Sequence, residues 1–199
     1  MEKVEIAGFP SPLAWEPDPV GWIATEDTLA VEAGPKTDVF VDPGDGTAIL
    51  NAPRLLGEVG GDYSLSARVT VAFRSDYDAG VLLLWANERL WAKLCFELSL
   101  QHEPMVVSVV TRGVSDDCNS FTVDGDAVRL RVARLGQAFA FHASTDAETW
   151  RLVRYFALEP GLDPRIGFLA QSPRGAGCSV QFEDISFLPG RLADIRSGA

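Results

Sequence analysis

Alternation of apolar and polar residues with a period of two is the feature that most constrains the fold of this 199-residue chain. In the clearest stretch, Tyr63–Phe73, every second side chain is apolar and most of those between them are polar. Successive side chains of a strand point to opposite faces of the sheet, so this pattern predicts a strand with one buried and one solvated face. Residues 128–132 alternate in the same way. The chain therefore favours β-structure.

A change of phase near the end of the chain predicts a β-bulge. The apolar residues of 178–182 alternate in one phase, whereas those of 185–187 alternate in the other. A slip of one residue would turn the second set outward, unless the strand accommodates an extra residue. We expect the pair Glu183–Asp184 to supply it.

Turn signals decide the class of β-fold. Signals that contain glycine occur at 42–46, 60–62, 124–126, 135–137, 159–161 and 172–175. Many strands joined by frequent turns, with almost no sustained period of 3.6 residues, predict an antiparallel sandwich or barrel. No linker or repeat divides the chain. We therefore expect one domain over residues 1–199, with a core from about 15 to 188 and a short C-terminal tail at 189–199.

Composition and charge exclude several classes of partner. Lysine and arginine number 17 against 28 aspartates and glutamates, and the net charge of −11 repels nucleic acid and anionic lipid. The longest apolar runs, such as Val81–Ala86, are far shorter than the ~20 residues of a membrane helix. Residues 1–5 do not resemble a signal peptide. We expect a cytoplasmic protein with no nucleic-acid or membrane partner.

The cysteines give no sign of a disulfide framework or a zinc site. Cys95, Cys118 and Cys178 are odd in number and lack the CxxC spacing. Buried, reduced thiols in a reducing compartment are the expected state. We predict no cofactor and no metal.

The segment Val81–Arg112 carries the strongest indication of a binding surface. Two apolar strands flank Asn87–Glu88, which is typical of a hairpin turn. In the second strand, Trp91, Lys93, Cys95 and Glu97 share one face, and Ala92, Leu94, Phe96 and Leu98 share the other. A ring, an ammonium and a carboxylate on one face can bind a polyhydroxy compound. The alternative is a solvated face with an ordinary Lys–Glu pair.

A polar segment follows the apolar strand Val106–Val110, and we interpret it as a loop that leaves the strand end. Asp116, Asp117 and Asn119 of this segment could ligate Ca²⁺ through their oxygens. The sequence lacks the D-x-D-x-D-G pattern of a calcium loop. An Asx-type turn that caps its own backbone is the alternative.

Catalytic signatures are sparse. Glycoside hydrolysis needs two carboxyl groups about 5–10 Å apart, and Glu97 with Asp116 is the candidate acid–base pair. The sequence contains no G-x-S-x-G elbow, P-loop or dinucleotide fingerprint. A lone strand histidine such as His142 is more often a hydrogen-bonded core or rim residue than a catalyst.

Several segments, in order along the chain, resemble the DUF1349 family, which includes the fungal regulation of enolase proteins and many small bacterial proteins. The resemblance covers roughly residues 15–187. It rests on Trp91–Glu97, Val107–Gly113, Ser115–Asp117, Phe141–Ser144 with Trp150, and Gly167–Pro173.

This resemblance implies a concanavalin A-like jelly roll of the lectin/glucanase superfamily, with two antiparallel sheets and any ligand in a concave groove. It implies no established activity for the bacterial members, although similar domains accompany glycosidases as sugar-binding accessories. By match to the family motifs, the groove would present Trp91, Lys93, Glu97, Asp116, Asp117, His142 and Gln171.

Two departures from the family pattern reduce the expected aromatic surface. Asp38–Phe40 reads Asp-Val-Phe where fungal-type members have Asp-Phe-Trp, and Ser115–Asp117 reads Ser-Asp-Asp where they have Ser-Asp-Trp. The N-terminal segment Phe9–Trp22 could also block the groove.

We therefore predict a non-catalytic module that binds a carbohydrate or sugar-like small molecule. Trp91 would stack on the ligand, and Lys93, Glu97, Asp116 and Gln171 would supply hydrogen bonds. One alternative is a regulatory factor that acts on a metabolic enzyme through a protein partner. The other is a glycoside hydrolase.

Overall fold

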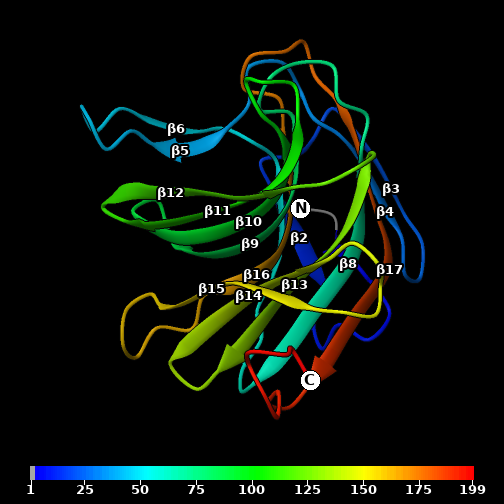
Figure 1. Cartoon of the computed structure of the whole chain (residues 1–199), viewed down its shortest axis with the longest axis vertical. Helices are drawn as coiled ribbons and strands as arrows, with labels where there is room; N and C mark the ends of the chain where they lie inside the picture. Colours follow the sequence, from blue (N-terminus) through cyan, green and yellow to red (C-terminus); the bar gives the residue numbers. More distant parts are fainter. Residues whose placement is uncertain (1–2) are drawn as a thin grey trace.

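The computed structural model describes residues 3–199, and these residues form seventeen strands and no helix. The strands build two large antiparallel sheets packed as a sandwich, together with a small two-stranded sheet (Figure 1). The predicted all-β, jelly-roll-like sandwich of two antiparallel sheets is thus confirmed. Within the described part of the chain there is no helix long and apolar enough to span a membrane.

The first sheet has eight strands. In spatial order they are β1 (Lys3–Val4), β2 (Leu13–Glu16), β7 (Arg54–Gly57), β16 (Arg165–Gln171), β9 (Ala79–Asn87), β10 (Leu90–Leu98), β11 (Pro104–Arg112) and β12 (Val114–Thr122). The expected hairpin turn at Asn87–Glu88 joins β9 to β10.

The second sheet has seven strands. In spatial order they are β15 (Arg151–Ala157), β14 (Ala138–Ser144), β13 (Ala127–Leu135), β8 (Tyr63–Val71), β17 (Ser179–Pro189), β4 (Leu29–Glu32) and β3 (Gly21–Ala24). The separate two-stranded sheet is a hairpin of β5 (Val39–Val41) and β6 (Ala48–Leu50).

The main core lies between the two large sheets. Leu94 and Phe96 of β10 point into it, as the alternation of that strand predicts. The ring of Phe168 on β16 meets the ring of Phe182 on β17 edge-on, with centroids 5.0 Å apart. This aromatic contact ties one sheet to the other. Buried residues ahead of position 15, among them Val4, also join the core.

The predicted bulge in β17 is present. Phe182 pairs with Val69 of β8, the register then shifts between Glu183 and Ser186, and Phe187 pairs with Leu65. Asp184 has a φ of 49°, the left-handed conformation found at some bulged positions. The extra residue returns the later apolar side chains to the core.

The outer face of the eight-stranded sheet holds a second apolar cluster. Trp91 and Cys95 of β10 are fully buried there, although they point away from the main core. Val39 and Val41 of β5 belong to the same cluster, so the β5–β6 hairpin covers this surface (Figure 1). We call it the hairpin-covered face. The segment Phe9–Trp22 does not contribute to this cluster.

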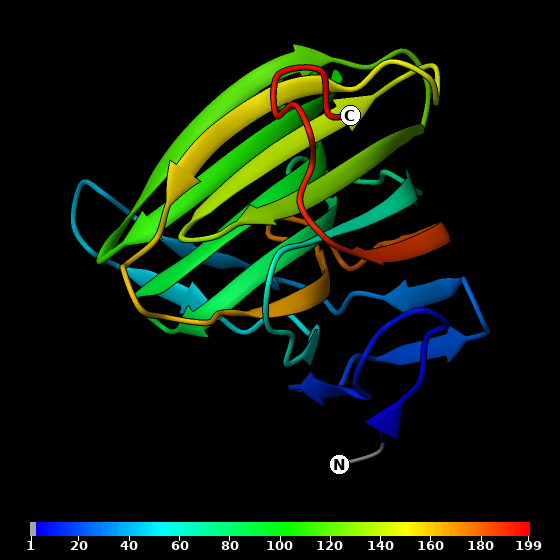
Figure 2. The same ribbon diagram turned by 90° about the horizontal axis from the view of Figure 1, so that it is seen from below.

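The C-terminal tail crosses the outer face of the seven-stranded sheet (Figure 2). Leu192 and Ile195 pack against a small buried cluster that includes Ala133, Leu135 and Ala140 of β13 and β14. The two sheets therefore carry different covers on their outer faces, a hairpin on one and the tail on the other.

Candidate functional site

A cavity of about 320 Å³ opens on the hairpin-covered face. Its sheet side is lined by Lys93 and Glu97 of β10, Val109 of β11, Asp117 of β12 and Gln171 of β16. Its other side is lined by Asp38, Phe40 and Asp42, at and around β5, and by Tyr77, which precedes β9. We call it the Lys93 pocket. Its volume is at the small end of the range for ligand sites.

Strand register explains why these side chains meet. Lys93 pairs with Val109 of β11, and Val109 pairs with Asp117 of β12, so the three form one row across the sheet. Gln171 of β16 and Glu97 both pair with Ala79 of β9, which gives a second row. Residues opposite one another on paired strands share a face of the sheet.

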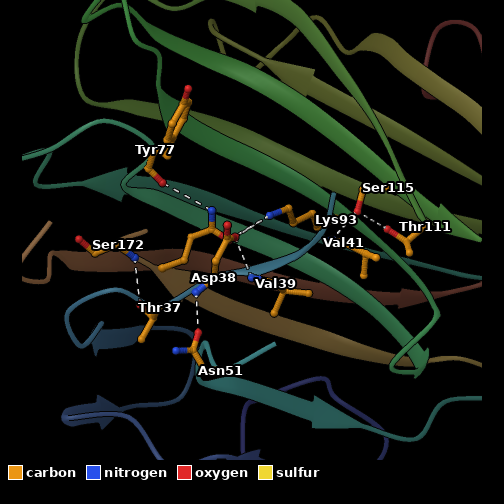
Figure 3. Close-up of polar contacts among 11 residues, drawn as sticks. Thr37, Asp38, Val39, Val41, Asn51, Tyr77, Lys93, Thr111, Ser115 and Ser172 are labelled. Carbon is orange, nitrogen blue, oxygen red and sulfur yellow. Dashed lines mark hydrogen bonds and ion pairs between the residues drawn. The ribbon is translucent and has the colours of Figure 1, made fainter. Parts of the chain in front are cut away.

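Lys93 lies at the centre of the pocket and is only 2% exposed. Its Nζ donates to Asp38 Oδ1 at 3.3 Å and to Gln171 Oε1 at 3.1 Å (Figure 3). The Asp38 carboxylate also accepts the Val39 amide at 2.7 Å. The amide nitrogen of Gln171 donates in turn to the Tyr77 carbonyl at 3.5 Å. This network connects β10, β16, β5 and the segment before β9.

The charge state of Lys93 follows from its surroundings. Burial lowers the pKa of its ammonium, but attraction to the Asp38 carboxylate and to Glu97 outweighs burial and leaves the pKa above its ordinary value. Lys93 is therefore a permanent hydrogen-bond donor and not a neutral amine nucleophile.

Two other carboxyl groups of the pocket, Glu97 and Asp117, have pKa values above their ordinary values. Burial raises the pKa of Glu97 to about 8, with further contributions from the charges of Asp117 and Asp38 that Lys93 only partly offsets. Partial desolvation at the edge of the pocket also raises the pKa of Asp117. Glu97 is thus mostly protonated near neutral pH, where its carboxylic acid can donate a hydrogen bond.

Two aromatic rings border the pocket. The Phe40 ring centroid lies 5.9 Å from Lys93 Nζ. Tyr77 adopts a left-handed conformation with φ of 68°, and the guanidinium of Arg174 lies 4.9 Å from its ring centroid. Both residues are half-buried. Such rings can pack against the C–H surface of a ligand.

The structure brings together four of the seven side chains that the sequence proposed for a groove. These are Lys93, Glu97, Asp117 and Gln171. The other three, Trp91, Asp116 and His142, lie elsewhere, each for a different reason.

Trp91 has the predicted orientation but is fully buried. Its ring stacks on that of Trp85, with centroids 6.5 Å apart and an interplanar angle of 12°. Its centroid lies 5.9 Å from Lys93 Nζ. The expected stacking of Trp91 on a ligand is therefore wrong in this structure, where the ring instead supports the ammonium from within the apolar cluster.

Asp116 lies on a strand and not in the expected loop, because residues 114–122 form β12. Adjacent strand residues point to opposite faces, so Asp116 faces away from Asp117 and forms an ion pair with Arg154 of β15 at 2.9 Å. Asp116 and Asp117 therefore cannot jointly ligate one ion. The proposed acid–base pair of Glu97 with Asp116 fails for the same reason.

His142 belongs to β14 in the other sheet. It is fully buried, and its Nε2 donates to the carbonyl of Ile195 in the tail at 2.8 Å. Burial lowers the pKa of its imidazole. Its role is to hold the C-terminal tail, and it takes no part in the pocket.

Sequence reasoning missed four residues that line the pocket, namely Asp38, Phe40, Asp42 and Tyr77. The Asp38–Phe40 segment does carry a signal, since it matches an aromatic motif of the family, but the sequence alone indicates only a departure from that motif. Its third position retains a ring. Nothing in the local pattern around Tyr77 pointed to a site.

Residues 15–189 match the model of the DUF1349 family, which is described as a protein of unknown function. No curated protein matches the chain. Among solved structures, a functionally unknown protein from Saccharomyces cerevisiae aligns with a TM-score of 0.83 and 25% identity, covering 90% of this chain and 97% of that chain.

Two more distant structures share the fold. A carbohydrate-binding module, CBM66 from Bacillus subtilis, has a TM-score of 0.55 and 14% identity, covering 87% of this chain and 94% of that chain. The GH43 BlXynB protein from Bacillus licheniformis has a TM-score of 0.64 and 13% identity, covering 87% of this chain. The chain spans only 36% of that GH43 protein.

Proposed function

Because the chain belongs to the DUF1349 family, whose description assigns no function, we propose from the site itself that the protein binds a small carbohydrate or sugar-like molecule in the Lys93 pocket. The proposal concerns binding and not cleavage. It differs from the sequence prediction in the groups that would contact the ligand.

The observation that carries the proposal is an unused donor on a buried ammonium. A lysine ammonium has three N–H donors, and Lys93 Nζ makes hydrogen bonds to Asp38 and Gln171. Among residues 3–199 no further acceptor is found for it, and the residue lines an open cavity. A ligand hydroxyl can accept the third hydrogen bond.

The rest of the pocket suits a polyol. The protonated Glu97 supplies a second donor, the carboxylate of Asp117 supplies acceptors, and each sugar hydroxyl can both donate and accept. The half-buried rings of Phe40 and Tyr77 offer apolar surface for the C–H groups of a sugar ring.

Fold analogy adds limited support. A structure described as a carbohydrate-binding module shares the sandwich, but one fold hosts many functions, so this likeness is associational. We further propose that the chain is one domain and works in the cytoplasm, where its three unpaired cysteines would stay reduced.

Calorimetric titration with glucose, galactose, mannose, fructose and xylose tests the proposal. We expect at least one sugar to bind, and the Tyr77→Ala variant to bind it about tenfold more weakly because a stacking ring is lost. Tyr155→Ala is the matched control, since Tyr155 is exposed on β15 in the other sheet. Absence of binding by every sugar, or equal weakening by both variants, would overturn the proposal.

A further inference from the structure

The Lys93 pocket contains more negative than positive groups. Asp38, Asp42, Glu97 and Asp117 line it, and Lys93 is the single cation among its lining residues. Lys93 forms its ion pair with Asp38. In the part of the chain that the structure describes, no ion pair is found for the other three carboxyl groups.

This imbalance already affects the protein without a ligand. The pKa of Glu97 is raised to about 8, mainly by burial and further by the negative charges of Asp117 and Asp38. The pKa of Asp117 is also raised. A second positive charge in the cavity would relieve this crowding, whereas an anionic group would increase it.

A bare metal ion does not fit the arrangement. Over residues 3–199, no three His, Cys, Asp or Glu side chains lie close enough together to hold a metal ion. The carboxyl groups are spread over separate elements, with Asp42 after β5, Glu97 on β10 and Asp117 on β12. The positive charge must therefore be carried by an extended molecule, which must also offer an acceptor to the free N–H of Lys93.

We propose that the Lys93 pocket selects an amino sugar in its ammonium form over the corresponding neutral sugar and over a sugar phosphate. The ammonium pairs with Glu97 and Asp117, and ring hydroxyls pair with Lys93 and Gln171. This inference rests on the proposed function, because it names the ligand class of the same site.

Binding of the ammonium should release protons, and this release can be measured. The charged and titratable groups around Glu97 are Lys93 on its own strand, Asp117 on β12, and Asp38 ahead of β5. An incoming cation stabilises the ionised form of Glu97, which gives its proton to the buffer. Titration below the pKa of Glu97 should therefore release up to about one proton for each amino sugar bound.

The experiment compares three matched pairs of sugars by calorimetry at about pH 6.5: glucose with glucosamine, galactose with galactosamine, and mannose with mannosamine. Glucose 6-phosphate is the anionic probe. In the pair that binds best, we expect the amino sugar to bind at least about tenfold more tightly than the neutral sugar, in line with a charge-assisted contact. The phosphate should bind more weakly than glucose.

Two variants test whether Glu97 is responsible for the preference for amino sugars. Glu97→Gln should abolish proton release, measured in two buffers of different ionisation enthalpy, and should reduce the amino-to-neutral affinity ratio at least about threefold. Asp116→Asn is the matched control, because Asp116 lies on the opposite face of the sheet and should leave the ratio unchanged.

The outcomes separate the two proposals. If neutral sugars bind without any preference for their amines, or if Glu97→Gln keeps the full preference, the inference is overturned while sugar binding stands. If neither neutral nor amino sugars bind, the proposed function itself fails, and the inference fails with it.

Discussion

Lys93 shows how a single residue can organise a site at the cost of local stability. Removing an ammonium from water is unfavourable, and here it is offset by Asp38, Gln171 and two aromatic rings 5.9 Å from Nζ. An apolar residue of similar size would avoid that cost. A buried ammonium at this position, despite that cost, is what we expect of a residue that contacts a ligand.

Lys93→Met tests this interpretation. The variant leaves the Asp38 carboxylate, whose side chain is 16% exposed, without its counter-ion. We expect the free energy of unfolding to fall by about 3 kcal/mol, as for other broken buried pairs. The double variant Lys93→Met/Asp38→Asn should recover a substantial part of the loss in urea denaturation. Strictly additive losses would mean that the two residues are not coupled.

Glu97 predicts how stability depends on pH. Its pKa is about 8 in the folded protein against an ordinary value of 4.5, so the folded state binds this proton more tightly. The stability it contributes is present below about pH 4.5 and is lost as pH rises through about 8. Glu97→Gln, which cannot ionise, should be close in stability to the wild type near pH 5 and exceed it by up to about 4 kcal/mol near pH 9.

Urea denaturation at both pH values measures this difference. The groups that face Glu97, namely Lys93, Asp38 and Asp117, are present in both proteins, so their own titration largely cancels. A variant that gained nothing at high pH would show that Glu97 is ionised in the folded protein at neutral pH.

At the scale of elements, β10 shows what the sequence can and cannot predict. Alternation correctly assigned Trp91, Lys93 and Glu97 to one face, because the period of a strand is a local property. It could not show that the β5–β6 hairpin, some fifty residues earlier in the chain, covers Trp91. Coverage depends on tertiary packing, so the ring that was expected to meet a ligand is buried.

The edge strand β12 shows a case in which the sequence pattern did not reveal the strand itself. Its residues 116–120 are exposed, so no apolar alternation distinguishes the strand from a loop, and the sequence was interpreted as a loop. The polar character arises because β12 lies at the edge of the sheet. Once the strand is recognised, the alternation of its side chains places Asp117 on one face of the sheet and Asp116 on the other.

The β5–β6 hairpin supplies one wall of the pocket, and Ser115 anchors it. Ser115 is 3% exposed, and its Oγ accepts the Val41 amide at 3.0 Å (Figure 3). Ser115→Ala removes that acceptor. We expect amide exchange at residues 39–41 to accelerate at least about fivefold, as loss of about 1 kcal/mol locally implies.

The matched control is Ser120→Ala on the same strand, where the serine is exposed. It should leave exchange in the hairpin unchanged. Equal acceleration in the two variants would indicate a general loosening of β12, and no change in Ser115→Ala would indicate that apolar packing alone holds the hairpin.

For the whole molecule, the two outer faces of the sandwich carry different features. The hairpin-covered face holds the Lys93 pocket, and the face of the other sheet holds the C-terminal tail. The shared core lies between them. Overall architecture was predictable because turns and alternation recur along the chain. The docking of the tail was not, because it is made by contacts between residues distant in sequence, such as the hydrogen bond between His142 and Ile195.

Removal of residues 190–199 tests whether the two faces are independent. Truncation strips Leu192 and Ile195 from the cluster on β13 and β14 and should lower the free energy of unfolding by about 1–3 kcal/mol. Amide exchange at residues 93–97 should remain unchanged, because the tail does not reach the pocket. Faster exchange there would mean that the tail stabilises the hairpin-covered face through the core.

The same truncation should change the response to acid. Burial lowers the pKa of His142 below 6.5 in the folded protein, so the stability it contributes is present above about pH 6.5 and is lost as pH falls through the folded value. Truncation uncovers the imidazole and removes much of that penalty. We therefore expect the full-length protein to be clearly more stable than the truncated one near pH 7.5, and the difference to shrink near pH 5. A difference that stayed constant over this range would show that His142 does not contribute, and that the tail is held by its other contacts, such as the packing of Leu192 and Ile195 and the hydrogen bond from Arg131 to the Gly198 carbonyl.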